Sequence, residues 1–335
     1  MKAQIKDIIT GGRAFESIMK DAKSGSPKQA YIFEGMKGIG KFTAAQLFAY
    51  AVHCTGSVKP CFSCNACKMH MAGTHSDFFV IGEDAKIKVS DIRALSDELY
   101  IKPALSDKKI FVIKNADKMN SAAQNALLKS FEEPPSYGII ILLSENVSNL
   151  LPTIRSRGVR IVFEPFSVPT VERYIKKYCP QKAENASFIA RYSGGIIGKA
   201  LEICDDDEFF GKRTDMFKAC AALTGDKISI IELSEVFEAK SGRKGFEKST
   251  LFFELFLSFI RDAIAFKTKA EIINSDKAEL IEDFSSKVTL EALIRVTDRT
   301  AELQSQINAS MKYELWIFSL LIHCWEDIHG KSNRS

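Results

Sequence analysis

The chain has 335 residues, of which 46% are hydrophobic and 26% are charged, and its formal net charge at pH 7 is +4. This composition is typical of a globular protein, and the mild positive charge permits contact with nucleic acid without predicting it. The longest apolar stretches, Gly138–Leu143 and Leu315–Trp325, are too short to span a bilayer, so we expect no membrane contact. Met1–Asp7 lacks the apolar core of a signal peptide, which favours a cytoplasmic protein.

After a helical lead-in over residues 1–30, predicted strands and helices alternate. Apolar runs predict five strands, at Tyr31–Phe33, Phe78–Ile81, Ile110–Ile113, Ile139–Leu143 and Val159–Phe163. Helical spacing predicts helices between them, at about Thr43–His53, Ser90–Leu99, Ala122–Phe131 and Ser148–Ser156. We expect Ser121 to be the N-cap of the third helix. Strands that are almost continuously apolar predict a parallel sheet covered by helices on both faces.

A glycine-rich stretch, Gly35–Lys41, follows the first predicted strand and opens a helix. Its glycines let backbone N–H groups converge on an anion, the helix N-terminus adds a partial positive charge, and the lysine reaches the outer phosphates. The stretch therefore predicts a nucleotide-binding P-loop. Its candidate binding residues are Gly35, Gly38, Gly40, Lys41 and Thr43.

The residues that ATP hydrolysis needs are missing around this loop. A Ser or Thr should follow the lysine to hold Mg²⁺, but Phe42 stands there, and Thr43 lies about 100° further around the helix. Two acids should follow the third predicted strand, but Lys114 and Asn115 do. The possibility that Asp117 is a displaced ligand of the metal stays open. Two losses at one metal site predict a vestigial loop that does not hydrolyse ATP and whose ATP binding is in doubt.

Four of the eight cysteines lie within fourteen residues, at Cys54, Cys61, Cys64 and Cys67. The tight C-x2-C turns match a tetrahedral Zn²⁺ site, and four protein ligands close the coordination shell, so the metal should be structural. Reduced cysteines without a metal and an iron–sulfur cluster stay open as alternatives. His53, His70 and His75 lie nearby, and we expect them to be surface or packing residues rather than ligands.

The pattern changes after Pro165, because helical spacing continues from there to the end of the chain. We expect three domains. An α/β domain over residues 1–165 would contain the zinc knuckle at about 54–67. A small helical lid over 166–208 and an all-α domain over 209–335 would follow.

Together these features resemble the clamp-loader subunits of bacterial DNA polymerase III, a family of AAA+ ATPases. The resemblance covers residues 28–165, and it includes Gln29–Gly35, the cysteine cluster with Ala72–Asp77 after it, and Asn125–Pro135. Within the family, the missing metal ligands resemble the non-hydrolysing delta-prime branch. Gly198 stands where the ATPases of the family carry a lid arginine that touches the nucleotide.

The resemblance also gives a role to Leu151–Gly158. The stretch is similar to a Ser-Arg-Cys motif whose arginine reaches across a subunit interface into the ATP site of the neighbour. That arginine corresponds to Arg157, and Gly158 replaces the cysteine. Without the resemblance, Arg157 is equally consistent with a surface arginine at the end of a helix.

The family implies a subunit that serves as a scaffold and supplies Arg157 in trans. Its partners would be the delta and gamma/tau subunits in a ring-like pentamer, with residues 209–335 in the oligomerising collar. The complex would load a sliding clamp onto primed DNA. Two alternatives stay open: an active ATPase of the gamma/tau type, and a zinc-containing DNA-binding protein with a vestigial P-loop.

Overall fold

The computed structural model describes residues 12–82, 87–225, 245–306 and 313–330. The chain divides into two compact units, Met1–Asp205 and Asp206–Ser335, which are described separately below. The outer ends of the predicted domains 1–165 and 209–335 lie outside the described residues. The division into three domains stays a prediction.

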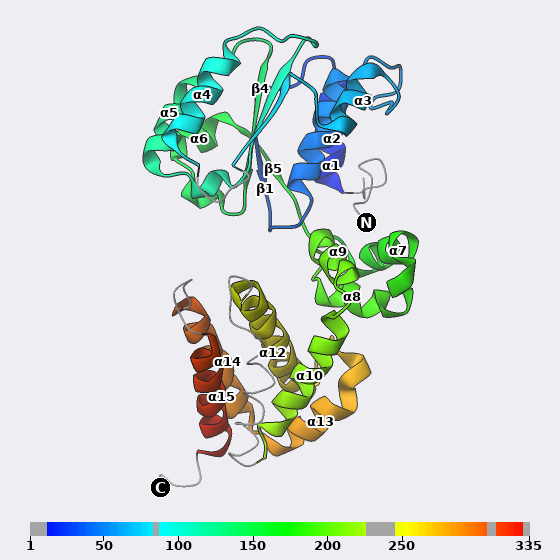
Figure 1. The fold of residues 1–335 in the computed structure, drawn as a ribbon, viewed down its shortest axis with the longest axis vertical. Coiled ribbons are helices and arrows are strands. Elements are labelled where there is room, and N and C mark those ends of the chain that lie inside the picture. Colours follow the sequence, from blue (N-terminus) through cyan, green and yellow to red (C-terminus); the bar gives the residue numbers. More distant parts are fainter. Residues whose placement is uncertain (1–11, 83–86, 226–244, 307–312, 331–335) are drawn as a thin grey trace. The chain divides into compact units, whose positions relative to one another are not determined.

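The first unit is built on a five-stranded sheet (Figure 1). The strands are β1 (Ala30–Glu34), β2 (Phe78–Ile81), β3 (Lys109–Ile113), β4 (Gly138–Ser144) and β5 (Val159–Val162). Their order is β2-β3-β4-β1-β5, and every neighbouring pair is parallel. Each predicted strand is confirmed to within one residue at either end, and so is the parallel α/β class.

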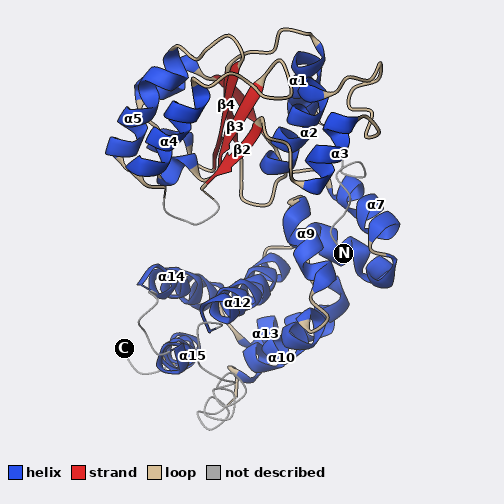
Figure 2. Cartoon of the chain, turned by 45° about the horizontal axis from the view of Figure 1, so that its top comes forward, coloured by secondary structure: helices blue, strands red, loops and turns tan. Residues whose placement is uncertain are grey.

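Helices cover both faces of this sheet (Figures 1 and 2). Those of the α/β part are α1 (Arg13–Lys23), α2 (Lys41–His53), α3 (Asn65–Ala72), α4 (Val89–Leu99), α5 (Ser121–Glu132) and α6 (Pro152–Arg157). Three more helices follow the sheet in the same unit: α7 (Val168–Tyr178), α8 (Ala186–Tyr192) and α9 (Ile197–Asp205).

Alternate residues of the inner strands enter two separate cores. Ile32 of β1 packs with residues of α4, α5 and α6, whereas Tyr31 and Phe33 pack with residues of α1 and α2. The alternation repeats in β3, where Phe111 and Ile113 face the first core. Both faces of β3 and β4 are buried, which explains their apolar runs, whereas the edge strand β5 is mostly exposed.

Three local predictions need correction. The N-cap of α5 is Asn120, whose side chain accepts a hydrogen bond from the N–H of Ala123, and Ser121 is the first helical residue. Asn caps a helix at least as well as Ser. The helix predicted over Ser148–Ser156 is split into a short 3₁₀ turn and α6, since Pro152 starts the helix anew. Helix α3 lies inside the cysteine-rich segment, where no helix was predicted.

The second unit is helical throughout the part that the structure describes (Figure 2). Its helices are α10 (Phe209–Ala222), α12 (Gly245–Lys267), α13 (Ala278–Lys287), α14 (Leu290–Gln306) and α15 (Tyr313–His329). Their interior is rich in phenylalanine, with Phe217, Phe253, Phe256, Phe259 and Phe284 fully buried. None of the described helices of the chain combines the length and the apolar character that crossing a membrane requires.

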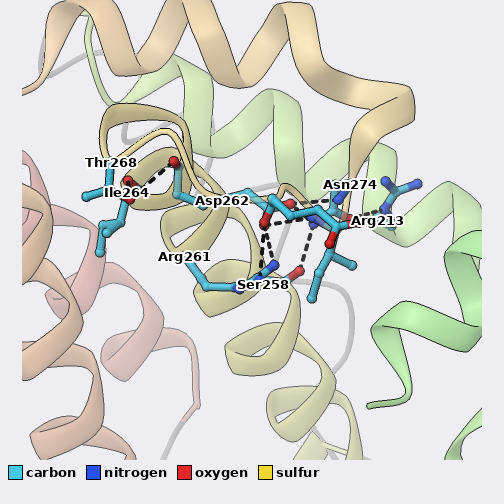
Figure 3. Close-up of polar contacts among 10 residues, drawn as sticks. Arg213, Ser258, Arg261, Asp262, Ile264, Thr268 and Asn274 are labelled. Atoms are coloured by element: carbon cyan, nitrogen blue, oxygen red, sulfur yellow. Dashed lines mark hydrogen bonds and ion pairs between the residues drawn. The ribbon is translucent and has the colours of Figure 1, made fainter. Parts of the chain in front are cut away.

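A buried polar network fixes the connection between α12 and α13 (Figure 3). The carboxylate of Asp262 accepts the backbone N–H groups of Ile273 and Asn274, at 3.1 and 2.7 Å, and the side-chain amide of Asn274. The amide oxygen of Asn274 then accepts from Nε of Arg213 on α10. Asp262 and Asn274 are completely buried, so each lost bond would leave a polar group without water.

Replacing Asp262 by Asn should lower the free energy of unfolding of this unit by about 2–3 kcal/mol, because an amide N–H₂ would face backbone donors. Both tryptophans, Trp316 and Trp325, belong to the second unit, so fluorescence in urea reports on it alone. Asp283→Asn is the matched control, since Asp283 pairs with Lys287 at the surface. That control should change the stability by less than about 0.5 kcal/mol.

Candidate nucleotide, metal and interface sites

The P-loop connects β1 to α2 and adopts backbone angles that suit glycine. Gly38 and Gly40 have φ values of 80° and 102°, in the left-handed region. A Cβ atom at Gly35 would lie 2.8 Å from the carbonyl oxygen of Phe163. The strand, loop and helix predicted from the sequence are therefore present in this order.

Lys41 is folded back onto the loop. Its ammonium donates hydrogen bonds to the carbonyl oxygens of Gly35 and Met36, the latter at 2.9 Å. The side chain is only 9% exposed, and burial lowers its pKa, while Glu145 and Asp117 act in the opposite direction. In this arrangement the lysine side chain stabilises the conformation of the loop through the carbonyl oxygens of the loop itself.

Phe42 and Lys114, which stand where metal ligands would be expected, contact one another. The ammonium of Lys114 lies 3.8 Å from the ring centre of Phe42, which is a cation–π contact. The sequence showed that each residue was unsuited to hold Mg²⁺, but it did not show that they pack together. A fixed positive charge beside the loop repels a divalent cation, so the pair opposes metal binding electrostatically.

The polar residues after β3 take structural roles. Asn115 has a φ of 51° and donates from its side chain to the carbonyl oxygen of Gly82. Asp117, considered as a displaced metal ligand, accepts the backbone N–H of Glu145 at 3.2 Å. Lys37, Lys114, Asp117 and Glu145 line a cavity of about 320 Å³ beside the loop.

The helical segment after the sheet touches the P-loop through backbone atoms. The N–H of Gly198 donates to the carbonyl oxygen of Gly38 at 2.9 Å. A Cβ atom at Gly198 would lie 2.7 Å from that oxygen and 2.8 Å from the Cα of Gly38. An arginine at this position therefore does not fit. Lys199, its neighbour, instead lies over the ring of Tyr192.

Arg157 is the last residue of α6, and its side chain is 44% exposed. Two residues that the sequence analysis did not single out govern its surroundings. Gln124, buried in α5, donates to the carbonyl oxygens of Met119 and Asn149 and accepts the N–H of Leu151, the N-cap of α6. Glu132, the last residue of α5, forms an ion pair with Arg157.

Close packing explains why a glycine follows Arg157. A Cβ atom at Gly158 would lie 2.6 Å from Cγ1 of Ile32 and 3.0 Å from Cζ of Phe131. Since Ile32 and Phe131 belong to the core behind α6, the missing side chain lets the end of α6 approach the end of α5. The replacement of the motif cysteine by glycine is thus matched by the packing.

The four cysteines predicted to bind a metal converge in space. Their sulfur atoms all lie within 4.8 Å of one another, and those of Cys54 and Cys64 are 4.0 Å apart. Tetrahedral coordination with a metal–sulfur distance of about 2.3 Å places sulfurs about 3.8 Å apart. Backbone N–H groups also point at the sulfurs, from Gly56 and Cys61 to Cys54 and from Cys64 to Cys61.

Hydrogen bonds and burial shift the pKa values of these thiols in opposite directions. Hydrogen bonds from Ser63 and the N–H of Cys64 lower the pKa of Cys61 to about 5, whereas burial raises the pKa of Cys54 and Cys67. Buried thiolates need a positive charge, and a metal supplies it. The donor set therefore fits a structural metal ion, which would tie the end of α2 to the start of α3.

The three nearby histidines form a buried stack. The rings of His53, His70 and His75 are 4.3–5.1 Å apart and inclined by 13–18°. One nitrogen of each ring lies within 4.8 Å of the other two, so the group could hold a metal ion. Two of the rings are hydrogen-bonded instead: Nε2 of His53 donates to the carbonyl oxygen of Lys108, and Nε2 of His70 then donates to Nδ1 of His53. This geometry favours packing over coordination.

Acid should destabilise the first unit through this stack. Burial lowers the pKa of His53 to about 4 and that of His70 to about 3, and it lowers the pKa of His75. The folded state therefore keeps the rings neutral while the unfolded chain binds protons below about pH 6.5. The free energy of unfolding should fall as pH drops from about 6.5 towards about 4, by up to about 1.4 kcal/mol per pH unit for each histidine.

Urea unfolding followed by circular dichroism at about pH 7.5, 6 and 5 measures this slope. The transition of the first unit is the one that tryptophan fluorescence does not report. His70→Phe keeps the ring but removes the titration, so it should flatten the slope, whereas His323→Gln in the second unit should leave it unchanged. A slope that is equal in all three proteins would contradict the prediction.

The sheet, the P-loop and the helical unit define a P-loop α/β protein in which Phe42 and Lys114 occupy the positions expected for metal ligands. Two family models match this chain. The model described as "DNA polymerase III, delta subunit" matches residues 11–167, and the model described as "DNA polymerase III, delta subunit, C terminal" matches residues 207–326. The chain belongs to this family of DNA polymerase III subunits.

Curated relatives agree with this family. DNA polymerase III subunit delta' of Bacillus subtilis is 35% identical over 207 residues, which are 61% of each chain. The delta' subunit of Pseudomonas aeruginosa is 35% identical over 50% of this chain and 52% of its own. DNA polymerase III subunit tau of Bacillus subtilis is 28% identical over 85% of this chain and 52% of its own. The matches span about half to three fifths of the length of these relatives.

Proposed function

We propose that the chain is a non-hydrolysing, delta-prime-like subunit of the DNA polymerase III clamp loader. It acts as a scaffold and supplies Arg157 in trans to the ATP site of a neighbouring subunit of the gamma/tau type. Its other partner is the delta subunit, and the assembled complex loads the sliding clamp onto primed DNA. The family membership and the delta' relatives support the choice of complex.

The observation that carries the non-hydrolysing role is the contact of Lys114 with Phe42. Phosphoryl transfer in P-loop proteins needs a metal held by a hydroxyl after the lysine and by an acid on a later strand. Here an aromatic ring and an ammonium occupy both positions. Gly198 adds a second obstacle, since its backbone contact with Gly38 leaves no room for a lid arginine.

An arginine in trans suits a chain that cannot turn over ATP itself. A guanidinium neutralises charge that develops on the transferred phosphoryl group, and arginine fingers contribute about 10³–10⁵ in rate in GTPases. Arg157 is half-exposed at the end of α6, where Gln124 holds the preceding residues. These features support its assignment as the finger.

ATP turnover tests the two halves of this proposal. The isolated chain should show no turnover, and a rate on the order of 1 s⁻¹ that Lys41→Ala abolishes would instead identify an active gamma/tau-type ATPase. In a complex reconstituted with gamma/tau and delta subunits, Arg157→Ala should lower DNA-stimulated turnover at least tenfold, roughly the loss of one strong charge contact. Arg155→Ala, two residues earlier on the same helix and about 200° around it, is the matched control and should retain the rate.

We propose further that the metal held by Cys54, Cys61, Cys64 and Cys67 is Zn²⁺ in a structural role. Four sulfur donors within 4.8 Å of one another suit zinc, and a closed shell leaves no position for a reacting water. The local apolar core is small, since Tyr50, Cys54 and Cys67 are its buried members. Metal binding would therefore provide much of the stability of this segment.

Metal analysis of the purified chain should give about one zinc per chain. Removing the metal with a strong chelator should unfold α3 and expose the Cys67 amide to hydrogen exchange, while the helices of the second unit keep their protection. Cys64→Ser should have the same effect, and Cys179→Ser, a buried cysteine outside the cluster, should retain the zinc. An iron signature or the absence of metal would overturn the assignment.

A further inference from the structure

Glu132 is bound to the side chain of Arg157. Its Oε1 lies 3.2 Å from Nε of Arg157, and Nη1 of the same guanidinium donates to the carbonyl oxygen of Thr153 at 3.4 Å. The first contact comes from the end of α5 and the second from the preceding turn of α6. The guanidinium is thus held from two directions although the residue lies at the surface.

Stability does not explain this ion pair. Its partners are 31% and 44% exposed, and pairs with such exposure add little to the free energy of folding. Glu132 is also the last residue of α5, where a carboxylate meets the negative end of the helix dipole. A pair that contributes little to folding but restrains a long side chain acts mainly on the orientation of that side chain.

The two contacts do not use all the donors of the guanidinium. They involve Nε and Nη1, whereas a guanidinium carries five N–H groups. The side chain is also 44% exposed. Glu132 and Thr153 can therefore hold the group while further donors remain for the oxygens of a phosphate.

We propose that Glu132 is a positioning residue for Arg157, and this rests on the proposed trans-acting role of that arginine. An unrestrained arginine has several rotatable bonds, and the entropy lost on fixing them would be paid at each ATP turnover. Glu132 removes this cost beforehand by fixing the guanidinium in one orientation. The effect belongs to the rate of the chemical step rather than to nucleotide binding or subunit assembly.

The experiment uses the complex reconstituted with gamma/tau and delta subunits and compares DNA-stimulated ATP turnover among variants of this chain. Glu132→Ala should lower kcat about three- to tenfold with the KM for ATP unchanged, since it frees the side chain. Glu132→Gln keeps the size of the side chain but removes the charge of the ion pair, so it should lower kcat in the same direction. Glu133→Ala is the control for a charge lost at the neighbouring exposed position.

A second measurement reports on the arginine directly in the isolated full-length chain. The Nε–H nuclear magnetic resonance signal of Arg157, identified by its loss in Arg157→Lys, should show fast motion in Glu132→Ala and Glu132→Gln but not in Glu133→Ala. This measurement does not need the complex, so it tests the positioning role of Glu132 even if a variant fails to assemble.

The outcomes separate the two proposals. If Arg157→Ala lowers turnover but Glu132→Ala does not, or if Glu132→Ala and Glu133→Ala are equal, Glu132 has no positioning role and the trans-acting arginine stands. If Arg157→Ala leaves turnover unchanged in the assembled complex, the arginine has no role in trans and the inference about Glu132 falls with it. Unchanged motion of Arg157 Nε–H in Glu132→Ala overturns the inference independently of turnover.

Discussion

The parallel order of the sheet is the constraint on which the other features depend. Because every strand runs the same way, the P-loop after β1, Lys114 after β3 and Glu145 after β4 all emerge at one edge. The same edge gathers a nucleotide site in working P-loop proteins. Here it gathers the ammonium of Lys114 on the ring of Phe42, together with Asp117, whose carboxylate accepts the backbone N–H of Glu145.

Much of this arrangement follows from the sequence. Two buried faces require apolar residues at successive strand positions, so the strands could be located to within a residue. The missing metal ligands were also visible, because one expected position directly follows the lysine and the others follow the third predicted strand. The spacing of the cysteines likewise predicted their convergence, which the sulfur positions confirm.

Other features depend on distances that local patterns do not contain. Lys114 and Phe42 are 72 positions apart, and only the sheet order brings them together. The histidines were expected near the metal site, but their stacking follows from the turn between α3 and β2. In the sequence, Gln124 and Glu132 resemble ordinary polar helix residues. The structure shows that Gln124 binds the N-cap residue of α6 and that Glu132 pairs with the last residue of α6. Asn120 and Ser121 both suit an N-cap position, so the sequence alone did not decide which of them caps α5.

The backbone contact between Gly38 and Gly198 also bears on how the chain can evolve. A side chain at position 198 would need room that the loop itself fills. Under the proposed non-hydrolysing role, a hydroxyl at 42, an acid at 114 or an arginine at 198 would each supply one of several missing groups, and the arginine would also force two backbones apart. A single substitution is therefore not expected to produce hydrolysis.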